Sequence, residues 1–195
     1  MNLVTMPLGS YQTNCYLVWG ENSDTCVVID PGFEPETVLL KAQQLGKKIE
    51  AILLTHGHFD HVGGVKEIAH TTDCRVYVCA QELSMPQQWT GGVLFYTDTY
   101  AEDDQVELAG VSFRVLHTPG HTPGSVCLTA EDHMFSGDTL FQSSCGRTDL
   151  PGGSWNEISR SLKRLAALEC DYTVHPGHGP STTLAEEKNY NPYMR

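Results

Sequence analysis

Hydrophobic positions along the chain fall into two kinds of pattern. Short apolar or alternating runs, bounded by Gly, Asn, Ser or Pro, are typical of β-strands. Strands are therefore predicted at residues 4–8, 15–19, 25–29, 51–54, 75–79, 105–108, 111–116, 125–129, 133–135 and 172–175.

Apolar residues at helical spacing predict helices that alternate with these strands. The predicted helices cover residues 36–45, 62–69 and 155–168. A short final helix is expected after the last strand, with Thr182 or Thr183 as its N-cap and Glu186 in its first turn.

This order of elements predicts the fold class. Strands followed by helices occur twice, which favours an α/β protein with two sheets packed face to face and helices outside. The length of 195 residues suits a single domain over residues 1–195. The least regular segment, residues 85–104, is expected to form a surface loop or flap.

Composition narrows the classes of function. A formal net charge of −12 argues against a nucleic-acid partner, because binding the phosphate backbone needs a basic face. No apolar run reaches the length of about 18 residues that a membrane span needs. The start lacks a signal-peptide pattern, and the seven cysteines form no C-x-x-C pair. These features predict a cytoplasmic protein and leave its oligomeric state open.

The strongest chemical signal is the segment His56-Gly57-His58-Phe59-Asp60-His61, directly after the strand at residues 51–54. Imidazole and carboxylate groups are preferred ligands for zinc. A glycine between two histidines is expected to permit a sharp turn. A zincin protease helix is excluded, because Gly57 stands where that motif requires Glu.

Three further segments each follow a predicted strand and contain glycine around a potential ligand, namely His121, Asp138 and His178. Strand ends gathered at one edge of the sandwich would bring these side chains opposite the first cluster. Seven candidate ligands exceed the needs of one tetrahedral zinc and suit two metal ions. Asp138 is the natural candidate to bridge them.

The pattern His-x-His-x-Asp-His followed by separate His, Asp and His resembles the metal signature of the metallo-β-lactamase fold superfamily. The resemblance covers nearly the whole chain and is greatest to short glyoxalase II-like (hydroxyacylglutathione hydrolase-like) enzymes. It implies an αββα four-layer sandwich with two zinc ions, or iron or manganese. The first metal would be held by His56, His58 and His121, the second by Asp60, His61 and His178, and both by Asp138.

The resemblance also implies roles for residues around the metals. A metal-bound hydroxide would attack the substrate carbonyl, and Asp60 would orient it as the catalytic residue. Asp30 would orient a ligand histidine or the loop backbone, or form an Asx turn with Pro31 and Gly32. Cys145-Gly146-Arg147 is similar to a segment whose basic residue grips the glutathione carboxylate, although a surface ion pair is an equal alternative for Arg147.

The expected substrate is a small acyl thioester such as S-lactoylglutathione. Departures from glyoxalase II put glutathione in question: Thr148-Asp149-Leu150 replaces an expected aromatic residue, Gly179-Pro180-Ser181 replaces a tyrosine, and the C-terminal helical glutathione-binding domain is missing. The alternatives are a mononuclear iron enzyme like persulfide dioxygenase, a lactone or phosphodiester hydrolase of this fold, and a metal-stabilised binding domain.

Overall fold

Two six-stranded β-sheets form the centre of the fold in the computed structural model, which describes residues 1–195. The first sheet follows chain order, with antiparallel pairing from β1 to β3 and parallel pairing from β3 to β6. Its strands are β1 (Asn2–Leu8), β2 (Thr13–Trp19), β3 (Thr25–Ile29), β4 (Lys48–Leu53), β5 (Arg75–Cys79) and β6 (Asp98–Tyr100).

The second sheet has the order β14-β13-β10-β9-β8-β7. Only β10 and β13 pair in parallel, and every other neighbour is antiparallel. Its strands are β7 (Gln105–Leu108), β8 (Val111–His117), β9 (Val126–Ala130), β10 (His133–Gly137), β13 (Thr173–Pro176) and β14 (Thr182–Thr183). A separate small hairpin joins β11 (Leu140–Phe141) to β12 (Ser144–Cys145).

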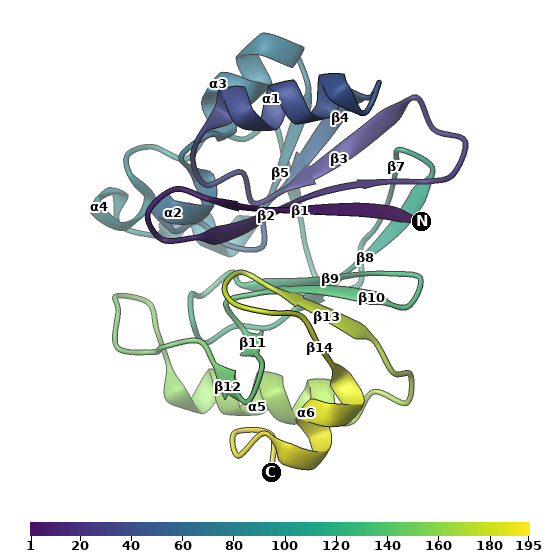
Figure 1. The fold of residues 1–195 in the computed structure, drawn as a ribbon. Helices are drawn as coiled ribbons and strands as arrows, with labels where there is room; N and C mark the ends of the chain where they lie inside the picture. The colour runs from purple at the N-terminus through teal and green to yellow at the C-terminus, as the bar shows by residue number, and fades with distance from the viewer.

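Helices cover the outer faces of both sheets (Figure 1). The helices α1 (Pro35–Gln44) and α3 (Val65–Thr72) pack on the first sheet, whereas α5 (Trp155–Ala166) and α6 (Leu184–Tyr190) pack on the second. Three shorter helices, α2 (Phe59–Val62), η1 (Ala80–Ser84) and α4 (Gln87–Thr90), lie in connecting segments. The predicted αββα four-layer sandwich is confirmed.

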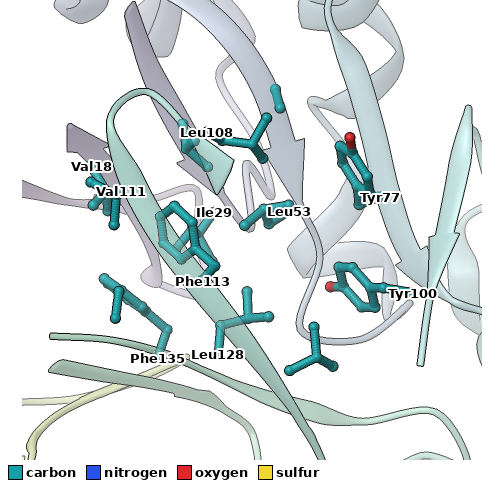
Figure 2. Packing of buried hydrophobic residues seen from close by; sticks show 14 of the residues in the cluster. Val18, Ile29, Leu53, Tyr77, Tyr100, Leu108, Val111, Phe113, Leu128 and Phe135 are labelled. Carbon is teal, nitrogen blue, oxygen red and sulfur yellow. The ribbon is translucent and has the colours of Figure 1, made fainter. Parts of the chain in front are cut away.

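Apolar side chains from both sheets close the central layer. Phe113, Leu128 and Phe135 of the second sheet face Ile29 and Leu53 of the first, and all five are fully buried (Figure 2). Two further buried clusters lie between each sheet and its helices. Burial of apolar surface in three successive layers is the main force that holds the sandwich together.

The two principal helices of the second half begin where the sequence indicates. Ser154 is the N-cap of α5, and its hydroxyl accepts a hydrogen bond from the Glu157 N–H at 3.3 Å. Thr183, one of the two predicted caps, accepts the corresponding bond from the Glu186 N–H at 3.2 Å. These side chains satisfy backbone donors that a helix start leaves unpaired.

Two predictions of local structure are wrong. The helix expected at residues 62–69 is two helices, α2 and α3, separated by Gly63 and Gly64. The segment 85–104 is more than a loop, since it contains α4 and the edge strand β6. A strand of three residues is stabilised by its pairing with β5, so its own sequence carries no periodic signal.

None of the helices combines the length and the apolar character that crossing a membrane requires. Five of the seven cysteines are buried as free thiols, in agreement with the apolar runs that contain them. The single-domain organisation and the cytoplasmic location stay predictions.

Candidate metal centre

The four ligand-bearing loops meet at one edge of the two sheets. The first follows β4 and continues into α2, which lies at one end of the strands of its sheet in Figure 1. The other three loops connect β8 to β9 and follow β10 and β13. Their positions bring together all seven predicted ligands, from both sheets.

One group of three histidines comprises His56, His58 and His121. Their nearest ring nitrogens all lie within 4.8 Å of one another, and all three residues are buried. His58 Nδ1 lies 2.9 Å from His121 Nε2. The rings of His56 and His58 are perpendicular, so their nitrogens approach one point from different directions.

A second group comprises Asp60, His61 and His178, again with ligand atoms within 4.8 Å of one another. His178 Nε2 lies 3.2 Å from Asp60 Oδ2 and 3.4 Å from His61 Nε2. The structure therefore separates six of the residues into the two predicted triads.

Asp138 lies between the triads. Its Oδ1 is 3.4 Å from His61 Nε2, and its Oδ2 is 3.5 Å from His121 Nε2 and 3.6 Å from His178 Nε2. A carboxylate that lies this close to histidines of both triads has the placement that a bridging ligand requires.

The donor atoms fit a divalent cation. His56 Nε2 and Asp138 Oδ1 are buried and have no hydrogen-bond partner. Buried polar atoms are otherwise almost always paired, since leaving one unpaired is costly. A mixed set of imidazole nitrogens and carboxylate oxygens suits zinc, iron or manganese.

The protonation states of His56, His58 and Asp138 also favour metal binding. Burial, reinforced by the neighbouring His61, lowers the pKa of His56 well below its usual value. Burial, followed by the effect of His121, lowers the pKa of His58 to about 4. Burial alone would raise the pKa of Asp138, but the adjacent His61, together with His121 and His178, outweighs it and holds that pKa low. Neutral imidazole and ionised carboxylate are the forms that bind metals.

A carboxylate behind the site orients His61. Asp30 Oδ2 lies 2.9 Å from His61 Nδ1 and also accepts the Thr55 hydroxyl at 2.5 Å, while Asp30 Oδ1 accepts the Thr55 N–H at 2.8 Å. A proton held on Nδ1 leaves Nε2 of His61 free to face Asp138. The orienting role of Asp30 stays a prediction, which these contacts support.

Backbone and hydroxyl groups orient other members of the two triads. The Arg147 carbonyl lies 2.8 Å from His121 Nδ1, and the Tyr11 carbonyl lies 3.2 Å from His178 Nδ1. Thr13 donates to Asp60 Oδ2 at 3.1 Å. The sequence interpretation missed Thr13, which lies outside every motif singled out above.

The candidate centre opens into a cleft of about 600 Å³. Aromatic and aliphatic side chains form much of its wall, including Tyr11, Phe59, Trp89, Phe141 and Leu150. Arg147 lines the same cleft, but its guanidinium makes two hydrogen bonds to the Asp149 carboxylate, at 2.7 and 2.8 Å. The predicted carboxylate-binding group is therefore already paired within its own loop.

Comparison with known proteins identifies the class. The family model of the metallo-β-lactamase superfamily matches residues 8–178. The hydroxyacylglutathione hydrolase GloC of Haemophilus influenzae is 32% identical over 209 residues, which cover 100% of this chain and 98% of that protein. The fold, the site and these matches define a metal-dependent hydrolase that binds divalent metal. The chain belongs to the metallo-β-lactamase superfamily.

Two solved structures extend the similarity to three dimensions. The B3 metallo-β-lactamase BLEG-1 superposes with a TM-score of 0.90 at 34% identity, over 99% of both chains. TTHA1623, solved in a di-iron-bound form, gives a TM-score of 0.83 at 40% identity, over 97% of this chain and 99% of that one. The individual ligand assignments in the present chain stay predictions from its sequence and geometry.

Proposed function

We propose that this protein is a dinuclear zinc-dependent hydrolase of a small acyl thioester such as S-lactoylglutathione. The position of Asp138 between two complete triads supports a dinuclear rather than a mononuclear centre. The name of the Haemophilus relative supports a glutathione thioester as the substrate class.

Bound metal ions would supply a water of lowered pKa and would polarise the substrate carbonyl. Asp60 is the proposed catalytic residue. Its contacts with Thr13 and His178 both use Oδ2, which leaves Oδ1 to orient the attacking water. The aromatic side chains of the cleft would exclude bulk water around the acyl group and strengthen the electrostatic interactions there.

Arg147 is proposed to bind a carboxylate of the leaving thiol. Because Asp149 already holds the guanidinium in a fork-to-fork pair, a substrate carboxylate has to replace that partner. The side chains of both residues are more than half exposed, so the pair is weak enough to exchange. We further propose that the site acts on a small-molecule acyl substrate and that the protein binds neither nucleic acid nor a membrane.

The di-iron form of TTHA1623 supports iron as the alternative metal. The competing activities are persulfide oxygenation by one iron, and hydrolysis of lactones or phosphodiesters. Two triads joined by one carboxylate favour hydrolysis over mononuclear iron chemistry. A binding domain that uses metal for structure is disfavoured by the open cleft beside the ligands.

A hydrolysis panel on zinc-loaded protein tests the proposal. Glutathione thioesters, lactones, β-lactams and phosphodiesters would be compared by kcat/KM, and metal content would be measured on the same samples. We expect two zinc ions per chain and the highest kcat/KM for the thioester. One iron per chain with oxygen consumption on glutathione persulfide would overturn the hydrolase assignment.

The role of Arg147 has a separate test. Arg147→Ala should raise KM for a carboxylate-bearing thioester more than for a neutral one, whereas Asp149→Asn should lower it by freeing the guanidinium. Arg160→Ala, an exposed arginine on α5, is the matched control. Equal changes of KM for both substrates would remove Arg147 from substrate binding.

A further inference from the structure

A buried carboxylate joins the two loops that carry the first triad of histidines. Glu82, in η1, is fully buried. Its Oε2 accepts the Gly57 N–H at 2.6 Å, and its Oε1 accepts the Gly124 N–H at 2.7 Å. Gly57 lies between His56 and His58, and Gly124 lies three residues after His121.

The two loops come from different sheets. Gly57 follows β4 of the first sheet, whereas Gly124 precedes β9 of the second. Burial raises the pKa of Glu82, and the backbone N–H groups of Gly57 and Gly124 act in the opposite direction. Each carboxylate oxygen thus accepts a backbone donor from one side of the sandwich.

The two glycines are explained by the closeness of this contact. A Cβ at position 57 would lie 2.8 Å from Glu82 Oε2, and a Cβ at position 124 would lie 2.8 Å from Glu82 Oε1. Gly57 does not have a positive φ, so its backbone conformation alone does not require glycine. Its role is to let the Glu82 carboxylate approach the backbone.

We propose that Glu82 is a positioning residue that fixes the separation of the His56–His58 loop from the His121 loop, and so shapes the first metal site. The proposal rests on the proposed function only in taking these three histidines as metal ligands. Glu82 makes no hydrogen bond to any member of the second triad. Replacing Glu82 should therefore weaken the binding of one of the two metal ions, the one held by the first triad.

The chemistry requires a carboxylate at this position. Two N–H donors approach the side chain from opposite loops, and an ionised carboxylate offers an acceptor to each. Glutamine has the same shape but a single acceptor oxygen, so its NH₂ group would face one of the N–H donors. One loop would then lose its partner and move away from the other.

Zinc titration of the metal-free protein with a competing chelator tests this role. Glu82→Gln should weaken one of the two zinc equivalents by roughly 10- to 100-fold, the range found when groups that orient metal ligands are removed. The visible absorption of the Co²⁺ form at saturation should also change, because it reports the coordination geometry. Glu67→Gln, the same chemical change at an exposed position of α3, is expected to leave both measurements unchanged.

Unchanged zinc affinity and an unchanged Co²⁺ spectrum in Glu82→Gln would overturn the proposal. A lower Tm of the metal-free protein with a wild-type Co²⁺ spectrum would also overturn it, since that pattern indicates a purely structural role. If Glu82→Gln does not fold, Glu82→Asp decides the question in the same titration. Its shorter side chain cannot reach both donors, so wild-type affinity there would refute the proposal.

Failure of the proposed function gives a different result. Wild-type protein loaded with two zinc ions but inactive on every thioester would remove the hydrolase proposal. The effect of Glu82 on zinc affinity would be measured independently of any substrate.

Discussion

Replacing Asp30 with Asn should move a proton on His61 and thereby weaken the second metal site. In the native protein His61 Nδ1 faces Asp30 Oδ2, so its Nε2 is free for a metal. In the variant, Oδ1 of Asn keeps the bond from the Thr55 N–H, and its NH₂ group takes the place of Oδ2. That NH₂ donates to Nδ1 and favours the tautomer with the proton on Nε2.

The magnitude follows from the bond that is lost. A hydrogen bond to a charged group contributes about 1.5–3 kcal/mol. Metal binding to the variant would have to restore the unfavourable tautomer, which corresponds to an affinity roughly 10- to 100-fold lower. Asp30 has φ +50°, and Asn tolerates that conformation well, so backbone strain should not contribute.

Zinc competition titrations of the metal-free variant measure the affinity, and ¹⁵N NMR of the imidazole identifies the tautomer of His61. Asp24→Asn, an exposed aspartate whose side chain makes no hydrogen bond, is the matched control. Wild-type affinity for both zinc ions, together with a proton retained on Nδ1, would refute the reasoning.

Three further predictions concern the bridging carboxylate, the core and the response to pH. Asp138→Ala should lower metal content and turnover together, because the Asp138 carboxylate lies beside histidines of both triads. Metal content would be measured by elemental analysis, and normal turnover in a metal-depleted variant would contradict this prediction. Phe113→Ala should lower the free energy of unfolding in urea by about 3–5 kcal/mol, and a loss below about 1 kcal/mol would show that the central core does not close around it. Burial, followed by the effect of His133, lowers the pKa of His175 to about 4 in the folded protein. Between about pH 6.5 and pH 4 the unfolded chain therefore binds more protons than the folded one, so stability should fall as the pH is lowered through this range. His175→Phe should flatten that fall in pH-dependent unfolding measurements, and equal slopes for both proteins would refute the assignment.

The predicted sandwich and the seven grouped ligands follow from local signals. A buried strand directly before the His56–His61 segment positions its own end, and strand ends of one sheet lie together at an edge. The amphipathic helix α5 is likewise defined by its own spacing, since Ile158, Leu162 and Leu165 all face the core.

The elements that the sequence did not reveal depend on distant partners. The strands β6 and β14 have two or three residues each and are fixed by pairing with β5 and β13. Glu82 is a lone acidic residue in an irregular segment, and its importance comes from two N–H groups that lie 25 and 42 residues along the chain. The ion pair between Asp149 and Arg147 likewise depends on the folded conformation of their loop, so the sequence alone does not predict it.

The division of the ligands between the two sheets has a consequence for the order of assembly. Each triad takes two residues from the loop after β4 and one from the second half of the chain, His121 or His178. Neither of these two triads is therefore complete within one half of the chain. His178 follows β13, so the proposed second ion could be held by its whole triad only after that strand is in place. With the proposed ligands, metal binding would follow the packing of the two halves, and a chelator that removed the ions would also remove a link between them.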